Sequence, residues 1–109
     1  GIHFMKVLEQ LGLRDVLADR LRPYPNGATA MRAMADEARA GAVGCTQVTE
    51  ILYTSGVSLL DVLPESLGLS TVYTAAVCAH ASQPSLARDL IATLVSDGAA
   101  ALRRDGGFV

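Results

Sequence analysis

Stretches with the apolar spacing of amphipathic helices alternate along this chain with short uncharged runs typical of buried strands. The helical stretches cover residues 2–11, 14–20, 28–39, 47–53, 83–94 and 96–105. The strand-like runs cover residues 42–46, 57–62 and 69–78. Strands without charges are expected to be covered on both faces, as in a parallel sheet flanked by helices. The alternation therefore predicts the α/β class, with a mostly parallel sheet.

The strongest helical pattern lies at residues 28–39, where small and apolar residues recur at helical spacing. Met31 and Met34 belong to its apolar face, and its charged side chains lie on the opposite face. The turn-forming residues 25–27, Pro-Asn-Gly, come directly before this helix, and Gly41 is expected to end it. The helix therefore has a well-defined start, whose first backbone amides lack acceptors within the helix.

Charge and length exclude several classes of protein. The 109 residues include 9 basic and 11 acidic side chains, which gives a net charge of −2, and basic residues are adjacent only at Arg103 and Arg104. Binding to a nucleic-acid backbone would require a basic face that this chain lacks. No apolar run approaches the roughly 18 residues of a membrane-spanning helix. We expect about one domain's length of chain that neither binds nucleic acid nor spans a membrane.

Residues that could carry catalysis are scattered. His3 and His80 have no local partner, and Glu50 is expected on a helix surface. Cys45 and Cys78 lack the spacing of metal ligands; buried free thiols are expected, and a disulfide between them stays open. No glycine-rich loop matches a nucleotide-binding motif. The sequence therefore predicts a protein that is not an enzyme, with no catalytic residues, no metal site and no cofactor.

The start of the helix at residues 28–39 is the first candidate binding site. The backbone amides near Gly27, Ala28 and Thr29 lack helical acceptors, and the helix dipole favours an anion there. Thr29 adds a hydroxyl group at the same end. The alternative is that Asn26 caps the helix and water satisfies the remaining amides.

The second candidate lies at Thr46 and Gln47, where the strand predicted at residues 42–46 ends. Ligands of open α/β sheets bind outside the carboxyl ends of the strands. The side-chain amide of Gln47 can donate two hydrogen bonds to an oxyanion without carrying a charge. The same amide could equally bond to loop backbone.

Four segments in order resemble the molybdate-binding proteins, the periplasmic solute-binding components of ABC transporters. The second segment is similar to a G-x-T-Q-x-[ST]-E-I stretch found in one branch of that family. The similar segments are Gly1–Gly12, Gly44–Leu52, Val72–Val77 and Ala87–Phe108. Together they span nearly the whole chain.

The resemblance implies a two-lobed periplasmic protein of the type II binding-protein fold. Such a protein delivers an oxyanion such as molybdate or tungstate to an ABC permease. The chain would be the C-terminal half only, with residues 1–66 as part of the second lobe and residues 67–109 returning to the first. The resemblance places backbone donors at Gly27, Ala28 or Thr29. It places Gln47 where the family often has a tyrosine.

Further expectations and alternatives follow from this resemblance. Half of a two-lobed protein is expected to bind oxyanions weakly and to self-associate through its uncovered apolar faces. The chain begins at Gly1 without a signal peptide, which is compatible with a mature product or a fragment. The alternative function is the effector-binding module of a LysR-type transcription regulator, although no helix-turn-helix is visible. A third alternative, a small α/β enzyme, predicts titratable side chains clustered in one pocket.

Overall fold

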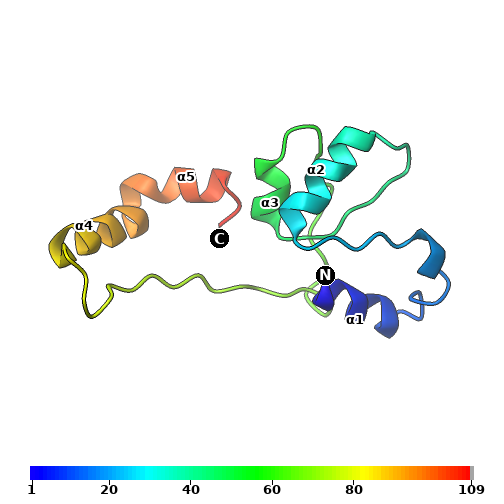
Figure 1. The fold of residues 1–109 in the computed structure, drawn as a ribbon, viewed down its shortest axis with the longest axis horizontal. Helices are drawn as coiled ribbons and strands as arrows, with labels where there is room; N and C mark the ends of the chain where they lie inside the picture. Colours follow the sequence, from blue (N-terminus) through cyan, green and yellow to red (C-terminus); the bar gives the residue numbers. More distant parts are fainter. Residues whose placement is uncertain (109) are drawn as a thin grey trace. The chain divides into compact units, whose positions relative to one another are not determined.

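In a computed structural model of the chain, residues 1–108 are described, and their regular structure is entirely helical (Figure 1). The α-helices are α1 (Ile2–Gln10), α2 (Gly27–Glu37), α3 (Val48–Tyr53), α4 (Pro84–Val95) and α5 (Ala100–Asp105). Two short 3-10 helices are η1 (Ala18–Arg20) and η2 (Asp97–Ala99). The chain divides into two compact units, Gly1–Leu69 (unit 1) and Ser70–Val109 (unit 2). No helix in the described range is long and apolar enough to cross a membrane.

The predicted α/β fold is wrong. Residues 42–46, 57–62 and 69–78 form no strand, and residues 1–108 contain no sheet. β-propensity measures how well a side chain fits a half-buried pleated surface, and the backbone of a strand needs a neighbouring strand to bond. These three runs lack such neighbours within the described range. The periplasmic type II fold, which depends on a parallel sheet, is overturned with them.

The predicted helix near the N-terminus is confirmed as α1, and its C-terminal end shows why it stops. Gly12 has a positive φ of 67°, which glycine adopts without steric cost. The Gly12 amide donates to the Glu9 carbonyl (3.0 Å), and the Leu13 amide donates to the Leu8 carbonyl (2.8 Å). These two bonds form a Schellman motif, which satisfies carbonyls that the helix leaves without partners.

The predicted helix at residues 28–39 is confirmed as α2, with a different end. Asn26 precedes the helix, and its side-chain oxygen accepts a hydrogen bond from the Thr29 amide (2.8 Å). The helix ends at Glu37, and Ala38 follows with a left-handed φ of 44°. The expectation that Gly41 ends the helix is therefore wrong, because Ala38 already makes the left-handed turn.

The core of unit 1 is small. Val7, Leu8 and Met31 are its buried apolar side chains. The loop after α2 crosses close to Met31: a Cβ at Gly44 would lie 3.3 Å from the sulfur of Met34 and 3.5 Å from that of Met31. Gly44 therefore lets an extended backbone run close to the methionine side chains of α2. α2 and α3 lie against each other in this unit (Figure 1).

Two further segments of unit 1 connect to this core. The helix predicted at residues 14–20 is largely wrong, because turns precede the single 3-10 turn of η1. Val16, expected to face inward, is 75% exposed, and a short helix without packing is only marginally stable. His3 ties α1 to a distant turn, since its Nε2 lies 2.8 Å from the Leu67 carbonyl oxygen.

Unit 2 consists of α4, η2 and α5 after the extended residues 70–79. Proline at the start of α4 and the Ser96 cap of η2 agree with the prediction; the Ser96 hydroxyl accepts from the Ala99 amide (3.3 Å). The Arg103 guanidinium donates to the carbonyl oxygens of Leu94 (2.6 Å) and Ser96 (2.9 Å). These bonds join the C-terminal end of α4 to α5.

The C-terminal end of unit 2 is also confirmed. Gly107, with a φ of 86°, ends α5 in a second Schellman motif. The Phe108 ring then packs edge-on against Tyr73, with ring centroids 5.3 Å apart and planes at 71°. No residue from 70 to 108 is buried, so unit 2 has no core of its own.

Candidate functional site

The N-terminal end of α2 lies directly against the residues that lead into α3. Gly27, the first residue of α2, contacts the side chains of Thr46 and Glu50 so closely that a Cβ there would overlap both. That Cβ would lie 2.7 Å from the Thr46 Cβ, closer than unbonded carbons approach. Gly27 is therefore required for the contact. The structure thus brings the first predicted binding segment against Thr46, the residue that precedes Gln47.

The backbone amides at this end of α2 divide into two groups. The Thr29 amide donates to the Asn26 side chain, so the capping alternative holds for this donor. The Ala30 amide donates to the Asn26 carbonyl (3.1 Å). Gly27 and Ala28 occupy the first two helical positions, whose amides have no acceptor inside a helix. These two half-buried residues supply the backbone donors that remain for a ligand.

Glu50 is the residue whose position sequence reasoning missed. It is half-buried, its carboxylate accepts a hydrogen bond from the Thr46 hydroxyl, and its backbone carbonyl accepts from the Thr54 hydroxyl (2.8 Å). A negative charge beside the start of α2 interacts favourably with the helix dipole. The four-residue spacing of Thr46 and Glu50 on one helical face was the signal that could have located it.

Gln47 caps the start of α3 with extended backbone and is exposed. Its carbonyl oxygen accepts from the amides of Glu50 (3.0 Å) and Ile51 (3.2 Å). Its side chain does not cap the helix. The backbone of Gln47 therefore begins α3 and leaves the side-chain amide for interactions outside that helix.

A positive charge also lies near the start of α2. The Arg32 guanidinium is 3.5 Å from the Thr29 hydroxyl oxygen, in an exposed position. Sequence reasoning considered only uncharged donors at this end, although the three-residue spacing from Thr29 could have identified Arg32. The start of α2 thus combines uncharged amides, one hydroxyl, one carboxylate and one guanidinium.

A family model for bacterial extracellular solute-binding proteins matches residues 1–109. The chain belongs to this family. Neither the curated proteins nor the solved structures contain a match to it.

Solute-binding proteins of this kind serve bacterial ABC transporters, so membership implies a ligand and an ABC permease as partners. It also implies a periplasmic or extracellular location, and such proteins are typically not enzymes. The predicted class of transport protein is therefore confirmed. Molybdate as the ligand and the C-terminal-half assignment stay predictions, and nothing in the comparison supports the LysR alternative.

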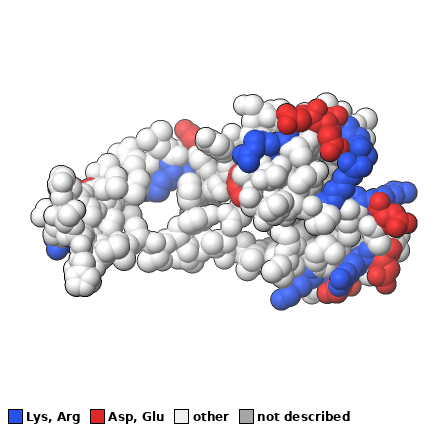
Figure 2. Space-filling view, in the orientation of Figure 1, with Lys and Arg blue, Asp and Glu red and all other residues white. Residues whose placement is uncertain are grey.

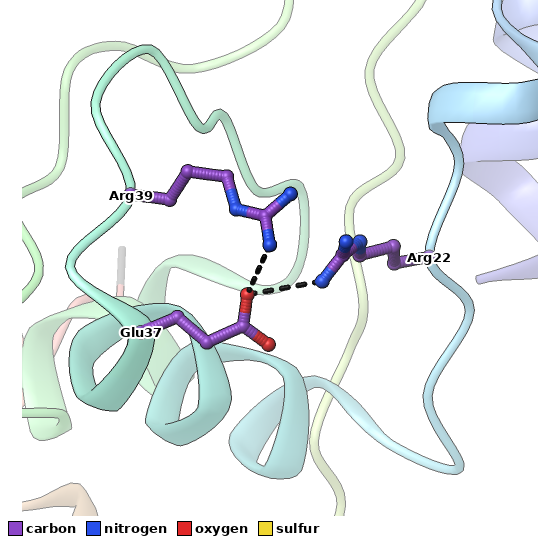
Figure 3. A network of polar contacts seen from close by, with 3 residues as sticks. All are labelled: Arg22, Glu37 and Arg39. Atoms are coloured by element: carbon purple, nitrogen blue, oxygen red, sulfur yellow. Dashed lines mark hydrogen bonds and ion pairs between the residues drawn. The ribbon is translucent and has the colours of Figure 1, made fainter.

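The charged residues of this solute-binding protein form a second cluster, at the other end of α2. Arg22 and Arg39 both approach one carboxylate oxygen of Glu37, at 3.0 and 3.4 Å (Figure 3). All three side chains are exposed, and exposed ion pairs contribute little stability because water screens them. Figure 2 shows basic and acidic groups interspersed over this part of the surface. We assign this cluster to the protein surface.

The remaining titratable groups do not assemble into a site. No group of three His, Cys, Asp or Glu residues within the described range could hold a metal ion. Cys45 is half-buried and Cys78 is exposed, and both are free thiols, so the expectation that both are buried is wrong for Cys78. Burial raises the pKa of the Cys45 thiol, and the nearby N-terminal amino group opposes this only in part. Cys45 is therefore a protonated, weakly reactive thiol at neutral pH.

Proposed function

We propose that this solute-binding protein captures an oxyanion of the molybdate or tungstate class and delivers it to an ABC permease from the periplasm. The ligand donors in this proposal are the backbone amides near Gly27, Ala28 and Thr29 and the side-chain amide of Gln47. The observation that carries it is the direct contact between Gly27 and Thr46, which places the starts of α2 and α3 together.

Uncharged donors suit the capture and release of an oxyanion. A bound oxyanion loses its water, and amides held in place by a helix compensate for that loss without forming a permanent ion pair. Because the Thr29 amide is already bonded to Asn26, the amides of Gly27 and Ala28 are the main backbone donors in this proposal. The Thr29 hydroxyl is a further donor at the same end.

The Glu50 carboxylate limits which anion can approach. It lies beside the same helix start, so it repels a dianion there and weakens binding. Replacing it by Glu50→Gln removes the charge and keeps the size of the side chain. We expect this variant to bind molybdate more tightly, on the order of tenfold. Glu37→Gln, at the other end of α2, is the matched control and should leave binding unchanged.

We also propose that the chain corresponds to the C-terminal half of a longer two-lobed protein. Residues 1–66 would belong to the second lobe, and residues 67–109 would return to the first. Further ligand donors would then come from the opposite lobe, and these 109 residues alone would bind an oxyanion only weakly. The absence of any buried residue from 70 to 108 supports self-association of the chain as it stands.

The test is an NMR titration of the ¹⁵N-labelled chain with sodium molybdate, with sodium sulfate and sodium tungstate in parallel. The proposal expects chemical-shift changes at residues 27–29 and 47 that are reduced in a Gln47→Ala variant. Gln10→Ala, at the exposed end of α1, is the matched control and should titrate like the unmodified chain. Shift changes confined to other residues would refute the proposed site. Sub-micromolar affinity of this chain alone would refute the C-terminal-half assignment.

A further inference from the structure

The chain exposes much more surface than a compact protein of its mass. Its accessible surface is 8798 Å², whereas a compact monomer of 11.4 kDa exposes about 5,800 Å². The difference, about 3,000 Å², exceeds the area that a stable protein–protein interface of standard size buries. The exposed surface is therefore large enough to include an interface with another chain.

The helix α4 contributes a continuous apolar stripe to this exposed surface. Leu86, Leu90 and Leu94 are 61%, 60% and 52% exposed, and their four-residue spacing places them along one side of the helix. Ala87 and Ile91, on the adjacent side, are half-buried. Figure 2 shows mostly uncharged surface over this part of the chain. The leucine stripe thus lacks a partner, while the neighbouring side of α4 is partly covered.

We propose that the leucine stripe of α4 docks against the same stripe of a second copy of this chain. The two α4 helices run antiparallel, with a two-fold axis at Leu90. Leu86 and Leu94 each lie four residues from Leu90, so the antiparallel arrangement brings leucine against leucine along the whole stripe. This names the surface for the self-association proposed above and rests on that part of the proposed function.

The symmetry of the stripe is what favours a second copy over a different partner. A two-fold interface uses the same patch on both chains, so the patch must be complementary to itself. A stripe that reads leucine in both directions from Leu90 and carries no charge meets this condition. No charged group is desolvated and no like charges meet in the contact, because Arg88 lies on the opposite side of α4.

The first test is chemical cross-linking of single-cysteine variants. The native thiols are removed by Cys45→Ser and Cys78→Ser, and Leu90→Cys is introduced. Because Leu90 lies on the two-fold axis, a short bis-maleimide should link most of the chains into covalent dimers. Arg88→Cys, on the opposite side of α4, is the matched control and should stay monomeric. Equal cross-linking of the two variants would overturn the proposal.

The second test is sedimentation equilibrium across a concentration series. The unmodified chain should form dimers, and Leu90→Glu should be monomeric over the same range with unchanged helical circular dichroism. Arg88→Glu should dimerise like the unmodified chain. A monomeric unmodified chain would overturn the proposal and leave the stripe for a different partner, as would a Leu90→Glu variant that still dimerises. Since the NMR titration reads ligand binding separately, either result leaves the proposed oxyanion site to its own test.

Discussion

Replacing Gly27 by alanine tests the contact between α2 and α3 on which the candidate site depends. The new Cβ would overlap the Thr46 hydroxyl and the Glu50 carboxylate and would lie 2.7 Å from the Thr46 Cβ. The helix must therefore shift away from the start of α3, or both side chains must rotate. Either response separates the groups that we place at the ligand site.

Two effects of opposite sign determine the size of the change. Alanine is favoured over glycine within a helix by roughly 0.5–1 kcal/mol, which stabilises the variant. Overpacking a close contact costs about 1–3 kcal/mol, which destabilises it. Because Thr46 and Glu50 are both half-buried, their rotation is restricted, and the packing cost should exceed the gain. We expect a net loss of about 1–2 kcal/mol in the free energy of unfolding.

Urea denaturation followed by circular dichroism measures this change, and hydrogen exchange at the α2 and α3 amides locates it. Gly98→Ala is the matched control, because its Cβ would meet only the Ser96 hydroxyl oxygen at an ordinary 3.7 Å. Combining Gly27→Ala with Thr46→Gly should recover part of the loss by removing the closest carbon. A Gly27→Ala variant as stable as the unmodified chain would refute the close contact.

Three further outcomes are expected. Asn26→Ala removes the cap of α2 and should cost about 1 kcal/mol in urea denaturation, whereas Asn26→Asp should not. His3→Ala removes the hydrogen bond to Leu67 and should cost about 0.5–1.5 kcal/mol, with faster amide exchange in the turn at 64–68. Because burial raises the pKa of the Cys45 thiol, its alkylation by iodoacetamide should stay slow at neutral pH and accelerate only in alkaline buffer, whereas the exposed Cys78 reacts first; mass spectrometry of timed samples distinguishes the two.

The helices could be predicted because their signals are local. Gly12 ends α1, Asn26 starts α2, and Ser96 caps η2, each through hydrogen bonds between residues close in sequence. The strands could not be predicted in the same way, because an apolar run does not reveal whether a neighbouring strand is present to bond with it. The run at 69–78 illustrates this, since Val72 is 87% exposed in an extended segment rather than buried in a sheet.

The candidate site could be predicted only in part. Local signals identified the start of α2 and the residues around Gln47, and the structure brings Gly27 against Thr46. The part played by Glu50 depends on a contact between segments that lie more than a dozen residues apart, which spacing within one helix does not show. Arg32 was missed because only uncharged donors were considered at that end.

The two hydrogen bonds of Arg103 have a consequence for how unit 2 unfolds. One guanidinium nitrogen holds the carbonyl oxygens of Leu94 and Ser96, on either side of the junction between α4 and η2. Neither helix can fray at that junction without breaking bonds made by the other, so α4 and α5 should melt in a single cooperative step. The bend between them thus behaves as a stiff elbow, and a chain that docks on α4 meets a surface whose far edge is already fixed.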